Sequence, residues 1–83
     1  MPDMIYISEK GNRIVFDDFA DDTKEYGIYW GNMCPHCRNK YSGILENRVS
    51  SGGSDEGICS VKGCKNNACY YVDFKMNEVI FAD

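Results

Sequence analysis

The spacing of the cysteines constrains this chain more than any other feature of its sequence. Five cysteines occur in 83 residues: Cys34 and Cys37 form a C-x2-C pair, Cys59 and Cys64 form a C-x4-C pair, and Cys69 follows. The 21 residues between the two pairs come close to the interval of about 15–20 residues that separates the halves of common zinc modules. Tetrahedral Zn²⁺ takes four sulfur or nitrogen ligands, and two cysteine pairs supply that number.

We therefore expect one structural Zn(2+), bound by Cys34, Cys37, Cys59 and Cys64. A C-x2-C turn places two thiolates on one side of the ion, and Gly63 permits the tight backbone turn that the second pair needs. Four thiolates close the coordination sphere and leave no open position for a substrate. The protein is accordingly not expected to be an enzyme.

Two further candidate ligands are expected to stay outside the metal site. Cys69 opens a β-rich run and is predicted to be a free, partly buried thiol, although it is also placed to replace Cys59 or Cys64 as a ligand. His36 lies between the first two cysteines, where its side chain is expected to point outward.

The composition favours a small, mostly β domain whose hydrophobic core needs additional stabilisation. Ile, Leu, Val and Phe together number 17, and Leu45 is the one leucine. This argues against a leucine-rich helical bundle, while the Ile, Val, Tyr and Phe content suits pleated, half-buried surfaces. A chain of this length buries only roughly 60% of its unfolded surface and usually needs a disulfide, a metal or a partner. We predict a single domain over residues 1–83, mostly β, with a small α+β arrangement as the alternative.

The first 33 residues are predicted to hold a β-hairpin and a strand. Residues 4–7 and 13–16 are apolar and flank turn residues, and Ile5 and Ile7 are expected to form the buried face of the first strand. An acidic loop or helical turn is expected at 17–25, and a short strand at 26–30.

Residues 34–74 are predicted to form the zinc-binding module. Its segment 38–49 has helical spacing weakened by a Ser-Gly pair; a short helix is expected there, with a strand as the alternative. Residues 50–57 have the composition of a flexible loop. A second hairpin is expected over residues 70–82, with strands at 70–74 and 78–82 joined by a turn.

The N-terminus and the lack of long apolar runs lead us to expect a cytoplasmic location. The N-terminus lacks the basic and apolar regions of a signal peptide, and no stretch approaches the roughly 20 apolar residues of a membrane span. No membrane partner is expected. Because cytosolic thiols stay reduced, cysteine pairs there indicate metal ligands before structural disulfides.

A thiol redox site is the main catalytic alternative. The sequence Cys34-Pro35-His36-Cys37, preceded by Trp30, is similar to the active site of thioredoxin-fold oxidases. That fold places a proline against the cysteines from downstream, whereas the only prolines here are Pro2 and Pro35. The hypothesis of a thiol redox site would also leave the second cysteine pair unexplained.

The second cysteine pair carries a resemblance to a known group. Residues 57–74, with the pattern C-x3-G-C-x-N-x-A followed by an aromatic strand, and the upstream CPHC motif resemble small zinc-ribbon-like proteins of bacteria and their phages. The resemblance covers residues 34–74 and implies metal binding by Cys34, Cys37, Cys59 and Cys64. It also implies a zinc-ribbon-like domain with two β-hairpins and two cysteine turns, and it brings no particular activity.

Charge and aromatic content suggest what the surface binds. The net charge is −4, which argues against strong affinity for phosphate backbones. We therefore expect a protein-interaction or adaptor module with an unknown protein partner. The candidate contact residues are aromatic: Tyr26, Tyr29, Trp30, Tyr41, Tyr70 and Tyr71. The favoured interpretation of these side chains is nevertheless that they fill the core of a chain with one leucine.

Nucleic-acid binding remains the alternative function. Residues 34–65 hold five basic and three acidic side chains, and many zinc ribbons bind nucleic acid. The basic side chains nearest the cysteine turns are Arg38, Lys40, Lys62 and Lys65. A steep loss of affinity with salt would distinguish this function from protein binding.

Overall fold

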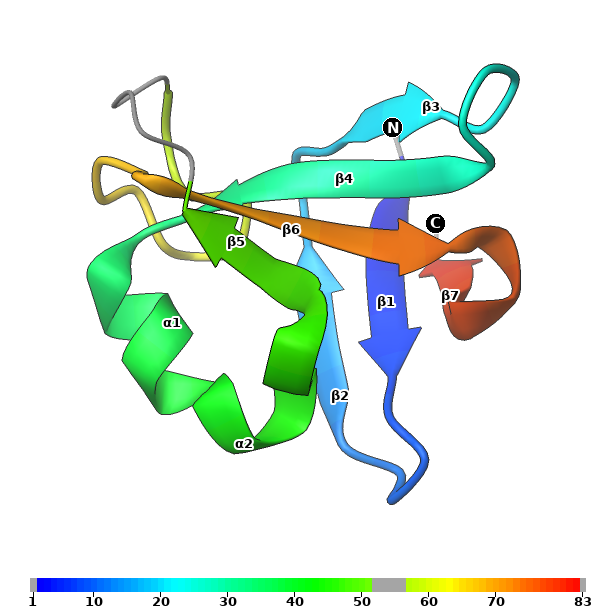
Figure 1. Ribbon diagram of the computed structural model, residues 1–83. Helices are drawn as coiled ribbons and strands as arrows, with labels where there is room; N and C mark the ends of the chain where they lie inside the picture. Colours follow the sequence, from blue (N-terminus) through cyan, green and yellow to red (C-terminus); the bar gives the residue numbers. More distant parts are fainter. Residues whose placement is uncertain (1, 52–56, 83) are drawn as a thin grey trace.

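Two antiparallel sheets make up most of the protein (Figure 1). The computed structural model describes residues 2–51 and 57–82. One sheet has the strand order β2-β1-β7 and the other the order β3-β4-β6-β5. In chain order the elements are β1 (Asp3–Ile7), β2 (Arg13–Phe16), β3 (Ala20–Asp22), β4 (Ile28–Met33), α1 (Pro35–Lys40), α2 (Ser42–Leu45), the 3-10 turn η1 (Glu46–Arg48), β5 (Val49–Ser51), β6 (Tyr70–Lys75), the 3-10 turn η2 (Met76–Glu78) and β7 (Val79–Ala82). The prediction of a mostly β fold with short helical pieces is confirmed.

The N-terminal hairpin forms as predicted, with one difference in its buried face. β1 and β2 are antiparallel, with Met4 opposite Phe16 and Tyr6 opposite Ile14. These four side chains are buried, whereas Ile5 and Ile7 are half-buried on the other face of β1. The expectation for Ile5 and Ile7 was wrong because β1 turns its larger Met and Tyr side chains toward the second sheet.

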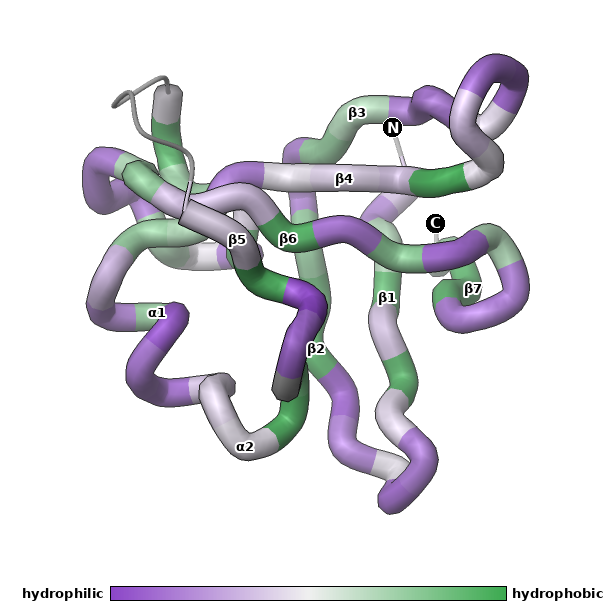
Figure 2. Tube along the Cα trace, in the orientation of Figure 1, coloured by the Kyte–Doolittle hydropathy of each residue, from purple (hydrophilic) through white to green (hydrophobic). Residues whose placement is uncertain are grey.

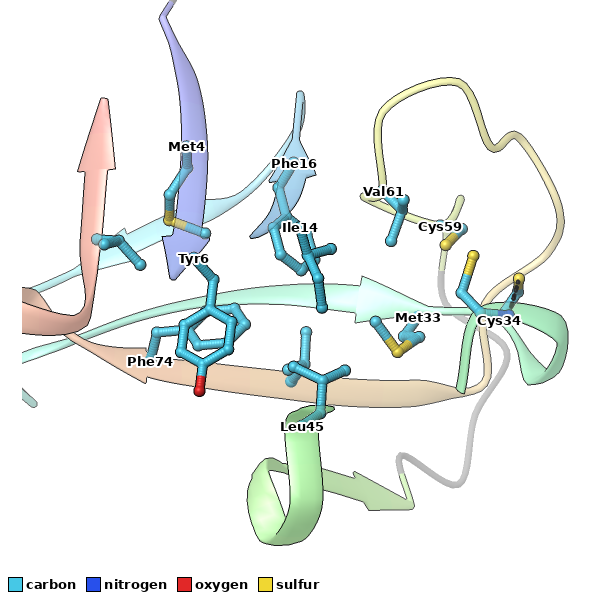
Figure 3. Close-up of a cluster of buried hydrophobic side chains, with 13 residues drawn as sticks. Met4, Tyr6, Ile14, Phe16, Met33, Cys34, Leu45, Cys59, Val61 and Phe74 are labelled. Atoms are coloured by element: carbon cyan, nitrogen blue, oxygen red, sulfur yellow. Dashed lines mark hydrogen bonds between the residues drawn. The ribbon is translucent and has the colours of Figure 1, made fainter. Parts of the chain in front are cut away.

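The core lies where the two sheets cross (Figure 3). The ring of Phe74 on β6 stacks on Tyr6 at 4.6 Å between centroids and lies 5.3 Å from the ring of Phe16. Met33 and Val72, on the same face of the four-stranded sheet, are also fully buried. The N-terminal hairpin therefore packs against β6. In Figure 2 the hydrophilic residues gather in the connections, such as the β1–β2 turn.

The predicted C-terminal hairpin is wrong in its pairing. Strands occur at both expected places, but β7 pairs with β1 in the other sheet, with Val79 opposite Tyr6. The connection η2 is a 3-10 turn in which the Glu78 carboxylate accepts a hydrogen bond of 2.8 Å from the backbone N–H of Lys75. Glu78 also pairs with the Arg48 guanidinium. These contacts turn the chain away from β6, and the side chain of Val79 is buried.

Several element boundaries also differ from the predictions. The acidic segment 17–25 contains the short strand β3, which pairs with β4, and the strand expected at 26–30 runs instead from Ile28 to Met33. The segment 38–49 is mostly helical, as expected, but the helix starts earlier, at Pro35. The expected loop 50–57 begins inside strand β5, and residues 52–56 lie outside the described residues. Of the helices in residues 2–51 and 57–82, none has the length and hydropathy that a membrane crossing requires.

We predict that replacing the Phe74 ring with a smaller side chain weakens the contact between the two sheets. Phe74→Leu should lower the free energy of unfolding by about 1–2 kcal/mol, because a stacked, fully buried ring is replaced by a smaller side chain. Denaturant unfolding of metal-saturated protein, followed by circular dichroism, measures the change.

The matched control is the same substitution at Phe81, whose side chain is 43% exposed. Phe81→Leu should cost less than about 0.5 kcal/mol. Equal losses at the two positions would contradict the assignment of Phe74 to the centre of the core.

Candidate metal centre

Four cysteine sulfurs lie together at one end of the core. The Sγ atoms of Cys34, Cys37, Cys59 and Cys64 are all within 4.8 Å of one another, and all four thiols are free. Tetrahedral coordination at about 2.3 Å places sulfur atoms about 3.8 Å apart, and the Sγ atoms of Cys34 and Cys64 are separated by 3.6 Å. The first three side chains are buried and Cys64 is half-buried. The cluster can therefore hold a metal ion and is compatible with a structural zinc site.

The first cysteine pair is positioned by the passage from β4 into α1. Cys34 follows the last residue of β4 and caps the helix, and its sulfur accepts a hydrogen bond of 3.4 Å from the backbone N–H of Cys37. Pro35 occupies the start of the helix, where a backbone N–H would have no acceptor within the helix, so the lack of an N–H in proline costs no hydrogen bond. Because residues three apart on a helix share a face, Cys34 and Cys37 present their sulfurs to the same point. This pair sits at a helix start rather than in an isolated turn.

The second pair is positioned by a turn, as the sequence predicted. The backbone N–H of Cys64 donates to the carbonyl of Val61 at 3.0 Å, and Gly63 has a φ of +85°. Side chains other than glycine rarely adopt that conformation. The backbone N–H of Cys59 donates to the carbonyl of Asn66 at 2.9 Å, so the residues on both sides of the turn are held together.

Ser60 attaches the second cysteine pair to β4 and was missed by the sequence analysis. Its side chain is buried, and its hydroxyl accepts a hydrogen bond of 2.9 Å from the backbone N–H of Asn32. Its own N–H donates to the Asn32 carbonyl, and its carbonyl accepts from the N–H of Asp17. A Cβ added at Gly31 would lie 3.0 Å from the Ser60 hydroxyl. The glycine beside the CPHC motif was the available signal for this close approach.

The pKa values of Cys34, Cys37 and Cys59 are shifted in different directions. Burial raises the pKa of Cys34, but hydrogen bonds from the Cys37 backbone, the Asn66 side chain and Cys64 outweigh it and lower that pKa to about 7. Burial raises the pKa of Cys37 and of Cys59, and neighbouring thiols raise that of Cys37 further. A bound divalent cation favours the thiolate form of each ligand, so it supplies the charge that this buried cluster needs to ionise fully.

Cys69 and His36 lie outside the cluster, as expected. Among the described residues, the four clustered sulfurs do not include that of Cys69, whose backbone N–H donates to the Met33 carbonyl at 3.2 Å. Cys69 is half-buried, and the His36 side chain is exposed. Cys69 thus lies directly before β6 and is not one of the four clustered residues.

No protein-family model, curated protein sequence or solved structure matches this chain. The resemblance to zinc-ribbon-like proteins therefore stays an expectation, and function has to be argued from the geometry of the site and the surface around it.

We predict that the four clustered cysteines bind metal as one set. Cys→Ser at position 34, 37, 59 or 64 should lower the metal content of the purified protein and broaden its unfolding transition, because each serine leaves three thiolates. Elemental analysis combined with thiol titration measures both effects. Cys69→Ser is the matched control and should keep full metal content; loss of metal in this variant with retention in Cys59→Ser would reverse the ligand assignment.

We also predict that Gly31 is required for the second cysteine pair to dock. Gly31→Ala should lower the free energy of unfolding by about 1–3 kcal/mol, because the new methyl group meets Ser60, whose hydrogen bonds prevent it from moving away. Thermal unfolding of the metal-loaded protein tests this. Gly43→Ala, where an added Cβ meets nothing within 4 Å, should be neutral or stabilising. A neutral Gly31→Ala would show that Ser60 is free to shift.

Proposed function

We propose that the protein is a small, non-catalytic module stapled by one structural Zn²⁺, bound by Cys34, Cys37, Cys59 and Cys64. The observation that carries the proposal is the convergence of four free sulfurs, from two segments far apart in the chain, within 4.8 Å. Soft thiolates select zinc over the hard cations Mg²⁺ and Ca²⁺. The likeness of residues 34–74 to zinc-ribbon-like proteins supports the same proposal.

The free energy of zinc binding is of the same order as the stability of a whole domain. Structural zinc binds small peptides with about 10–16 kcal/mol, which compares with the total stability of about 5–15 kcal/mol of an ordinary domain. Three of the four thiols belong to the buried core, so the metal would hold the end of the core that hydrocarbon side chains leave unfilled.

Metal removal is the experiment that tests this part of the proposal. Chelation at neutral pH should release one zinc per chain and abolish most of the secondary structure, and stoichiometric Zn²⁺ should restore it. Far-UV circular dichroism and elemental analysis on the same samples measure both. A chelated protein that keeps a cooperative unfolding transition, or that holds another metal after purification, would overturn the proposal.

A closed thiolate site argues against catalysis. All four sulfurs lie within 4.8 Å of one another, and as zinc ligands Cys34 and Cys37 would not be available as a redox pair. The zinc-loaded protein should therefore show no turnover in an insulin-reduction assay, with thioredoxin as the positive control. Measurable turnover would revive the thiol–disulfide alternative.

Protein binding is favoured over nucleic-acid binding by the state of the basic side chains near the metal centre. Lys62 pairs with Asp3 at 2.6 Å and Lys65 lies 3.6 Å from Asp17. The Arg38 guanidinium lies over the ring of Tyr70. Cations that already have carboxylate or aromatic partners release few counterions from a phosphate backbone. We therefore propose a protein-interaction or adaptor module located in the cytoplasm.

A further inference from the structure

One face of the four-stranded sheet is left uncovered. In Figure 1 the strands β1 and β2 lie behind β4 and β6, and among residues 2–51 and 57–82 no helix crosses in front of them. Because side chains alternate along a strand, β4 and β6 turn Met33 and Val72 toward the core and Trp30 and Tyr71 to the uncovered face.

The aromatic residues divide cleanly between the core and this face. Tyr29, Tyr41 and Tyr70 pack against the buried core. Trp30 and Tyr71 are half-buried outside the core, and Tyr26 beside them is 70% exposed. Tyr29, Tyr41 and Tyr70 therefore help to fill a core that contains one leucine. The other three aromatic side chains do not have this role.

The three outward aromatic side chains line one open hollow of about 510 Å³, together with Asp22, Ile28, Ser50 and Asp73. The hollow has mostly apolar walls, and its two acidic side chains come from β3 and β6. The backbone N–H of Tyr26 donates to the Asp22 carbonyl at 2.9 Å, which holds the turn carrying this ring beside β3.

Trp30 and Tyr71 are held in place by contacts within the protein. Trp30 and Tyr71 meet edge to face, with centroids 5.5 Å apart and an interplanar angle of 81°. The indole N–H of Trp30 donates to the Asp22 carboxylate. This hydrogen bond sets the plane of the indole and keeps a negative charge at its edge. Two walls at right angles with carboxylates beside them suit a compact cationic group.

We propose that this aromatic–acidic hollow binds a cationic side chain, lysine or arginine, of a basic segment in a partner protein. Cations are attracted to the faces of tryptophan and tyrosine rings within about 6 Å of the centroid. The hollow is lined by two carboxylates, and among the described residues no lysine or arginine lines it. Lys75 lies further along the same face, opposite Ile28, and does not line the hollow.

A single-stranded nucleic acid would use the same rings differently. Bases stack on exposed aromatic side chains, but their phosphates need nearby cations. Asp22 and Asp73 place negative charge where the phosphates would pass, so the charge of the hollow favours a basic peptide.

The proposal deepens the proposed role as an interaction module and rests on it, but the binding surface is separate from the sulfur cluster. Trp30 is the only tryptophan in the chain, so its fluorescence reports on the hollow directly. The full, metal-loaded chain is titrated with a short peptide of alternating glycine and arginine, with its lysine counterpart, with a glutamine peptide of equal length and with oligothymidylate.

The expected result is a saturable change in fluorescence with the two basic peptides and none with the glutamine peptide or the oligonucleotide. Asp22→Asn keeps an oxygen for the indole N–H and removes the charge; Asp73→Asn removes the second charge. Each should weaken binding by about threefold to tenfold, and Tyr71→Leu should weaken it by a similar factor. Glu9→Gln, an exposed charge in the β1–β2 turn, is the matched control and should bind as the unchanged protein does.

Each of three results would overturn the inference. Equal weakening by Glu9→Gln and by the hollow variants would mean that the peptides respond only to the net negative charge. A response to oligothymidylate without one to the basic peptides would assign the rings to nucleic acid. Metal content measured on the same samples separates this inference from the zinc proposal. A fully metal-loaded protein that binds no basic peptide refutes only the proposal that the hollow binds cationic side chains. A folded, metal-free protein that binds the peptide refutes only the proposal of a structural zinc ion.

Discussion

The ring of Phe74 holds the two sheets together, and the remaining structure depends on that crossing. It stacks on Tyr6 and lies against Phe16, so both strands of the N-terminal hairpin are fixed to β6 through one side chain. β6 in turn pairs with β4 along six residues, and β4 leads directly to Cys34. The direction in which the first cysteine pair faces is thus set by aromatic packing at the far end of the same strands.

The parts of the structure that were predictable from sequence are those fixed by local chemistry. Cys34 and Cys37 are brought together by helical spacing, and Gly63 permits the turn before Cys64 whatever surrounds it. The N-terminal hairpin is specified by a turn between two short apolar runs. Such features need no knowledge of distant partners, which is why the local geometry of each cysteine pair and the first hairpin could be deduced before the fold.

The parts that were not predictable depend on which strands become neighbours. β7 follows β6 closely in sequence, but its partner β1 lies at the other end of the chain. No local sequence pattern identifies β1 as the partner of β7. Tyr29 and Trp30 are adjacent and both aromatic; only the register of β4 decides which enters the core, since a slip of one residue exchanges the two faces. Ser60 acts through backbone hydrogen bonds to Asn32, and these leave little trace in sequence.

The alternation along β6 gives the two faces of one strand different physical roles. Val72 and Phe74 face the core, where substitution costs stability, while Tyr71 and Asp73 face the hollow, where substitution costs little folding energy. Under the proposed role of the hollow, the outward positions of β6 can be substituted to change what is bound, while the inward positions that stabilise the fold stay unchanged.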